Sequence, residues 1–164
     1  MSNLSDIPNK NDYYQNSENA MNTFQDSINR NDHPTLLGIF GFLNSDNIDK
    51  EMLNRTLEKV LASWNWENTW GWDYPLIAMT AARLDRPKLA IEALLMETQK
   101  NTYLLNGHNY QNNNLPIYLP GNGGLLTAVA MMAAGWEGSG GAESPGFPKD
   151  GTWVVKYENL LTLP

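Results

Sequence analysis

Three segments without a single charged residue constrain the fold of this chain most strongly. They are residues 34–43, 75–82 and 123–136, and their content of Leu, Ala and Met favours helix. A helix without charge on any face is normally buried all round. Between them lie residues 48–64 and 88–99, in which apolar side chains follow a helical repeat on one side only. This alternation of buried and amphipathic helices predicts a two-layer helical fold.

Polar stretches precede each uncharged segment and carry side chains suited to helix N-termini. Asp32 is expected to cap the first uncharged helix, Asp73 the second and Asn122 the third. Asp46 or Asn47 is expected to cap the amphipathic helix after residue 47. If the three buried helices run parallel, their N-termini share one rim. The sequence therefore predicts that the three polar stretches meet on one face of the protein.

The stretch before the second uncharged segment, residues 64–75, is the most unusual part of the sequence. It reads WNWENTWGWDYP, with four of the six tryptophans within nine residues and two carboxylates, Glu67 and Asp73. Large amphipathic rings beside amides and acids suit a surface that holds a polar, ring-shaped ligand. The alternative interpretation is a tryptophan-rich loop packed over the end of a helix. Composition alone does not separate the two interpretations.

Composition restricts the partners and cofactors of the chain. Its 164 residues, 41% of them hydrophobic, are enough for one domain with its own core. A net charge of −7 without a cluster of Lys or Arg argues against nucleic acid and anionic membranes as partners. With no cysteine and only two histidines, His33 and His108, the sequence predicts no metal site, and no motif implies a cofactor. The N-terminus lacks the apolar core of a signal peptide, and no run approaches the ~20 apolar residues of a membrane span.

The sequence divides into three parts. Residues 1–30 are polar and are expected to be irregular, with one weak helix across residues 19–30. Residues 31–137 hold the five helical segments. Residues 138–164 begin with a loop rich in Gly and Pro, and the β-branched residues of 152–157 predict a strand near the C-terminus.

Several segments together point to a known family. They are HPTLLGIFG, RTLEKVL, WGWDYPLIAMTAARL, NGHNYQ and LPIYLPGNGGLLTAVAMMAAG. Together they resemble the last third of the catalytic domain of six-hairpin glycosidases, and most closely the bacterial enzymes related to glycoside hydrolase family 95. The resemblance runs from about Asn31 to the C-terminus, where GFPKDGTWVVKYENL is similar to the start of a small β-sandwich. It implies an all-α, partial (α/α)6 toroid of alternating inner and outer helices, with a short C-terminal β element and an active-site cleft at one rim.

Two departures limit what the resemblance implies. It covers fewer than half of the six hairpins, and the general acid of the family is implied to lie upstream of this chain. In family 95 an acidic residue, the catalytic base, directly precedes the Gly-Asn that opens the last inner helix. Here Pro120 stands before Gly121 and Asn122, so the base does not carry over. The chain by itself is therefore expected to be inactive, as part of a glycosidase that is periplasmic or secreted.

Glycoside hydrolysis requires a protonated carboxyl group and a second carboxylate, and Asp73 and Glu67 are the candidates. A helix N-terminus favours the charged carboxylate, so Asp73 suits the base better than the acid. Its other interpretation is a helix cap. Glu67 lies between Trp66 and Trp70, whose apolar rings favour the protonated acid, although a solvated loop carboxylate is the alternative. Asp32 is expected to be a cap.

Candidate sugar-binding residues combine aromatic rings with hydrogen-bonding groups on the predicted rim. Each has a structural alternative: His33 as a satisfied polar group under the first helix, and the Asn and Gln residues as loop braces. The set is Trp66, Trp70, Trp72, His33, His108, Asn109, Gln111, Tyr118 and Asn122.

The sequence thus predicts part of a glycoside hydrolase. Its expected partners are an oligosaccharide or glycoside substrate and either the missing N-terminal part of the toroid or a second copy of the chain. The alternatives are a non-catalytic carbohydrate-binding fragment and a helical module that pairs with another chain.

Overall fold

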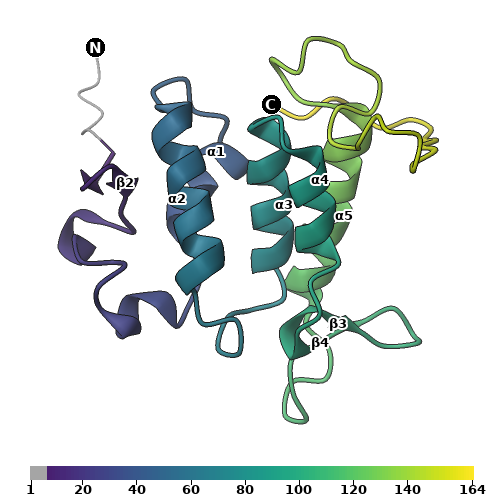
Figure 1. The fold of residues 1–164 in the computed structure, drawn as a ribbon. Coiled ribbons are helices and arrows are strands. Elements are labelled where there is room, and N and C mark those ends of the chain that lie inside the picture. Colours follow the sequence, from purple (N-terminus) through teal and green to yellow (C-terminus); the bar gives the residue numbers. More distant parts are fainter. Residues whose placement is uncertain (1–6) are drawn as a thin grey trace.

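The computed structural model describes residues 7–164, which form five α-helices and two small antiparallel sheets (Figure 1). Short 3-10 helices at Glu18–Ala20, Ser27–Arg30, Thr35–Leu37 and Gln99–Asn101 connect them. The helices are α1 (Gly38–Gly41), α2 (Lys50–Ser63), α3 (Asp73–Arg83), α4 (Pro87–Leu94) and α5 (Leu119–Ala134). In the sheets β1 (Asn9–Lys10) pairs with β2 (Tyr13–Tyr14), and β3 (Thr102–Tyr103) pairs with β4 (Asn109–Tyr110).

Helix α3 is the centre of the core. All of its 11 residues are buried, and it packs against α1, α4 and α5 (Figure 1). The prediction that residues 75–82 form a helix buried on all sides is therefore confirmed. At the C-terminal end of α3, the guanidinium of Arg83 lies 5.8 Å from the Trp136 ring and donates a hydrogen bond of 2.5 Å to the Pro164 carbonyl oxygen. Burial lowers the pKa of Arg83 to about 10.

Helix α2 is amphipathic, as its sequence predicts. Leu53, Leu57 and Val60 are buried on one side, at the spacing of one helical face. Its N-cap is Asp49, whose carboxylate accepts hydrogen bonds from the backbone nitrogens of Glu51 at 2.8 Å and Met52 at 3.0 Å. The predicted caps, Asp46 and Asn47, are wrong because Asp49 reaches the first free N–H groups of the helix. Such a cap stabilises a helix by ~1 kcal/mol.

The predicted all-α, partial (α/α)6 toroid is wrong. Residues 7–164 provide five α-helices, one of them a single turn, together with two two-stranded sheets. These are too few helices, and too mixed with strands, to form a double ring of paired helices. The uncharged segment 34–43 also fails to form one inner helix, because it divides into Thr35–Leu37 and α1.

The terminal parts also differ from prediction. The weak helix expected at residues 19–30 is replaced by two 3-10 turns. The strand expected at residues 152–157 does not form, and the nearest pairing in the described chain is a single bridge between Trp136 and Leu163. A strand needs a partner for its backbone groups, and Val154 instead stands 85% exposed.

Helix α5 is apolar but is not buried all round. Leu126 is 71% exposed and Leu119 is 63% exposed, on a helix without charged residues. Among residues 7–164, none of the helices combines the length and apolar content needed to cross a bilayer.

The predicted association with another chain stays a prediction, and α5 provides its test. We expect the chain to run above its monomer mass of 18.4 kDa in size-exclusion chromatography with light scattering, because exposed leucines on one helix favour association. Leu126→Glu should return the chain toward the monomer mass, whereas Ile28→Glu, at another site that is 71% exposed, should not. A monomer at all concentrations would contradict the prediction.

Candidate functional site

The three polar stretches meet at the N-terminal end of α3. The ring of His33 lies 4.6 Å from the Trp72 ring and 6.0 Å from the Trp70 ring, between ring centres. The Trp70 ring in turn lies 5.4 Å from that of Tyr118. The residues come from three distant parts of the chain, so the predicted convergence on one face is confirmed.

These rings continue into one line of neighbours, which we call the aromatic row: Phe42, Trp72, His33, Trp70 and Tyr118. Phe42, just after α1, stacks on Trp72 with ring centres 5.8 Å apart and an interplanar angle of 25°. Phe42 is 41% exposed and the other rings are partly exposed. The row is therefore open to a ligand along part of its length.

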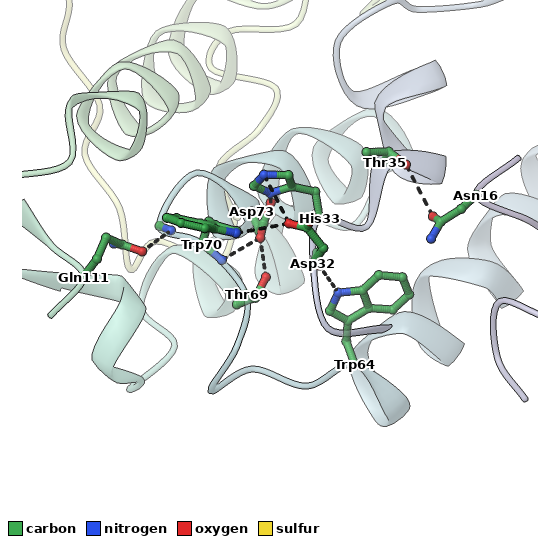
Figure 2. Close-up of polar contacts among 10 residues, drawn as sticks. Asn16, Asp32, His33, Thr35, Trp64, Thr69, Trp70, Asp73 and Gln111 are labelled. Carbon is green, nitrogen blue, oxygen red and sulfur yellow. Dashed lines mark hydrogen bonds and ion pairs between the residues drawn. The ribbon is translucent and has the colours of Figure 1, made fainter. Parts of the chain in front are cut away.

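Asp73 lies behind the row and is fully buried. Its carboxylate accepts a hydrogen bond from the Trp70 backbone nitrogen at 2.8 Å, and another from the Thr69 hydroxyl. A third contact joins it to His33 Nδ1 at 2.8 Å (Figure 2). Asp73 is the first residue of α3, with Trp72 at the N-cap position. Its side chain thus fastens the tryptophan loop and His33 to the helix, and the predicted role as N-cap is wrong.

His33 is held by a carboxylate on one side and faces a second one on the other. Because Asp73 accepts at Nδ1, the proton of the neutral imidazole lies on Nδ1 and leaves Nε2 as an acceptor. Nε2 lies 3.4 Å from Asp32 Oδ1, and the side chain is 26% exposed. Burial is the largest influence on the pKa of His33 and lowers it. The hydrogen bond to Asp73 and the charges of Asp73 and Asp32 outweigh burial, so the pKa of His33 is raised from 6.5.

Asp32 is exposed and accepts hydrogen bonds from two tryptophan side chains. Its side chain is 73% exposed and accepts a hydrogen bond of 3.1 Å from Trp70 Nε1 (Figure 2). Its carbonyl oxygen accepts another from Trp64 Nε1 at 2.6 Å. The N-cap position of the first helical turn is occupied by Pro34, so the predicted cap at Asp32 is wrong. Instead Asp32 adds an exposed carboxylate to the aromatic row.

Asn109 and Gln111 are fully buried, and Gln111 makes a hydrogen bond with the backbone of the tryptophan loop. Gln111 Oε1 accepts a hydrogen bond of 3.1 Å from the backbone nitrogen of Gly71, and Gln111 Nε2 donates to Asn109 Oδ1 at 2.6 Å (Figure 2 shows Gln111). Asn122 lies within α5 rather than at its cap. Its side chain accepts from the Asn109 backbone nitrogen at 2.9 Å and donates to the Gly107 carbonyl at 2.7 Å. The three amides are thus arranged as braces.

The remaining candidates lie outside this cluster. Glu67 is exposed on the loop. Trp66 packs against Tyr74 with ring centres 5.8 Å apart, and its Nε1 donates to the Leu61 carbonyl at 3.3 Å. His108 lies on the loop that leads into β4. Within residues 7–164, none of the three has a ring contact or side-chain hydrogen bond with the aromatic row.

Two features of the site were not predicted from the sequence. The first is the pairing of His33 with Asp73, which are 40 positions apart. The second is a pair of further side chains beside the tryptophans: Phe42 at one end of the row, and Lys100, whose ammonium lies 5.5 Å from the Trp70 ring centre. Long-range pairs of this kind leave no local spacing signal in a single sequence.

Comparison with protein-family models, curated proteins and solved structures finds no match to this chain. The resemblance to glycosidases related to family 95 therefore stays a prediction based on the sequence segments. In residues 7–164 no group of three or more His, Asp or Glu side chains is placed to hold a metal ion.

Proposed function

We propose that this chain binds carbohydrate on the aromatic row and contributes this surface to a glycoside hydrolase. The observation that carries the proposal is the combination of partly exposed rings with the exposed Asp32 carboxylate and the His33 imidazole. Aromatic rings pack against the apolar faces of sugars, and the hydroxyl groups of a sugar need fixed hydrogen-bonding partners nearby. Both requirements are met within one cluster.

The charge of the site supports a neutral sugar rather than an acidic one. Asp32 is the exposed charge nearest the imidazole, and the chain carries a net charge of −7. A sugar acid would be repelled by both. Lys100 lies over the far side of the row at Trp70, and its single positive charge does not reverse the balance.

The hydrolytic part of the proposal concerns Asp73 and Glu67. Asp73 is fully buried and already accepts from three groups, so its contribution to hydrolysis passes through His33. Glu67 is exposed and free to meet a substrate from the loop. A carboxylate acid/base mechanism needs two carboxyl groups on either side of the scissile bond. A non-catalytic sugar-binding role differs from this only in hydrolysis. Because the chain by itself is expected to be inactive, an assay with aryl glycosides separates the two roles in the longer glycosidase of which this chain would be part.

Sugar binding is tested by tryptophan fluorescence. We expect cellohexaose, xylohexaose or mannohexaose to quench the fluorescence of the chain, because Trp70 and Trp72 line the row. Trp70→Ala should weaken the best of these interactions by about tenfold or more, since it removes both a ring and the hydrogen bond that orients Asp32.

Trp153→Ala is the matched control for this test. Trp153 is 42% exposed and belongs to the C-terminal segment, which lies at the other end of α3 and α5 from the tryptophan loop (Figure 1). Its removal should leave sugar binding unchanged. Absence of quenching across the three hexasaccharides, or equal losses in both variants, would favour the structural interpretation of the tryptophan loop.

A further inference from the structure

Asp32 and His33 present two hydrogen-bond acceptors side by side within the aromatic row. Nε2 of His33 and Asp32 Oδ1 are 3.4 Å apart, Nε2 is an acceptor when the imidazole is neutral, and each side chain is held by a hydrogen bond. Asp73 holds the imidazole through Nδ1 at 2.8 Å, and Trp70 Nε1 holds Asp32 at 3.1 Å. Fixed acceptors of this kind select ligands by the position of their donors.

Two neighbouring acceptors require two neighbouring donors. Vicinal hydroxyl groups on a pyranose ring supply two O–H donors at about the separation of one hydrogen bond, which matches the spacing of Nε2 and Asp32 Oδ1. The ring of Trp72, 4.6 Å from that of His33, provides an apolar wall beside the pair. We propose that Asp32 and His33 form a specificity pair that recognises a vicinal diol of a neutral sugar, and that Asp73 positions His33 for this contact. This inference rests on the proposed sugar binding and identifies the hydroxyl groups of the sugar that the site would recognise.

Protonation of His33 removes one of the two acceptors. In the imidazolium form Nε2 becomes a donor directed at Asp32, so the two groups satisfy each other instead of a ligand. The charged groups that act on the imidazole are Asp32, on the same segment, and Asp73, on α3. The titratable groups farther along the row, Tyr118 and Lys100, contact the Trp70 ring. Asp32 and Asp73 favour the imidazolium. Sugar affinity is therefore expected to rise as pH increases through the pKa of His33.

The test compares methyl hexopyranosides with their 3-deoxy analogues. Removing the 3-hydroxyl leaves groups at positions 2, 4 and 6, so no vicinal pair remains while the ring is kept. The probes are the methyl glycosides of glucose, mannose and galactose, added to the full chain. Binding is followed by tryptophan fluorescence and by the Nε2 resonance of His33 in histidine side-chain nitrogen NMR, where only two histidines contribute.

We expect at least one intact glycoside to shift the His33 Nε2 resonance, and its 3-deoxy analogue to bind at least about tenfold more weakly. His33→Phe keeps a ring in the row but removes the acceptor, so it should abolish the discrimination. Asp32→Asn should reduce it, whereas Asp46→Asn, the same change at an exposed carboxylate on the loop before α2, should not. The wild-type comparison stands on its own if the His33 variant does not fold.

The outcomes separate this inference from the proposed function. Quenching of tryptophan fluorescence without a shift at His33, or with equal affinity for the 3-deoxy analogue, overturns the specificity pair and leaves sugar binding in place. Absence of any response to the glycosides and to the hexasaccharides overturns both.

Discussion

Gly71→Ala is expected to destabilise the fold by ~3 kcal/mol or more. A Cβ at Gly71 would lie 2.7 Å from Asn109 Cγ and 2.7 Å from Gln111 Nε2, and would overlap Asn109 Oδ1. Both amides are fully buried and hydrogen-bonded, so neither can move aside. Relieving the overlap would also break the bond from the Gly71 nitrogen to Gln111 Oε1 and leave buried polar groups unpaired.

Gly123→Ala is the matched control for Gly71→Ala, measured in the same way. A Cβ at Gly123 meets nothing within 4 Å, and the residue lies inside α5. Alanine there should raise the free energy of unfolding by ~0.5–1 kcal/mol, because it reduces the freedom of the unfolded chain. Urea unfolding followed by circular dichroism gives both values. A Gly71→Ala variant as stable as the wild type would mean that the brace formed by Asn109 and Gln111 is not rigid.

The helices were predicted where periodicity and charge agree. Residues 75–82 carry no charge and form the buried α3, and residues 48–64 show one apolar face and form α2. Helix α5 begins at Leu119, earlier than predicted, because Pro120 fits the first turn, where its missing N–H is not needed. Local signals of this kind act within a few residues and are visible in one sequence.

The first uncharged segment shows why absence of charge is not enough. Residues 34–43 divide into a 3-10 turn and the single turn α1, and Gly41 packs directly against α3. A Cβ at Gly41 would lie 2.6 Å from Thr80 Oγ1, so the glycine permits close helix contact rather than a longer helix. The predicted two-layer pattern counted this segment as one buried inner helix.

The sequence predicts where the site lies but not which of its side chains are exposed to a ligand. The convergence of His33, the tryptophan loop and Tyr118 follows from the order of buried and amphipathic helices. The order of helices does not predict which side chains of these stretches are exposed. Asn109 and Asp32 are both polar, and only tertiary contacts bury Asn109 and leave Asp32 exposed. For this reason the sequence predicts sugar contacts for the buried Asn109 and Gln111 and a capping role for Asp32, and both predictions are wrong.

Asp73 gives the second large effect, and it depends on pH. Asp73→Ala is expected to cost ~3 kcal/mol or more, because the Trp70 nitrogen, the Thr69 hydroxyl and His33 Nδ1 lose their shared acceptor in a buried position. Asp73→Asn keeps one acceptor oxygen and the shape of the side chain, so it should cost ~1–2 kcal/mol. Urea unfolding at several pH values measures both variants.

The pH dependence follows from the raised pKa of His33. A group whose pKa is higher in the folded state stabilises the fold fully below its unfolded value of about 6.5. That stabilisation is lost as pH rises through the folded pKa. Wild-type stability should therefore fall over this window, and Asp73→Asn should flatten the fall because the amide carries no charge to hold the imidazolium.

Asp49→Asn separates this effect from a general change of charge. Asp49 caps α2, where Asn serves as well as Asp, and it makes no contact with a histidine in the described chain. The free energy of unfolding of Asp49→Asn should match that of the wild type at each pH within a few tenths of a kcal/mol. Histidine NMR titration completes the test, since Asp73→Asn should lower the pKa of His33. An unchanged His33 titration in Asp73→Asn would contradict the pairing of His33 with Asp73. His33 would then be a polar group that only packs beside Trp72.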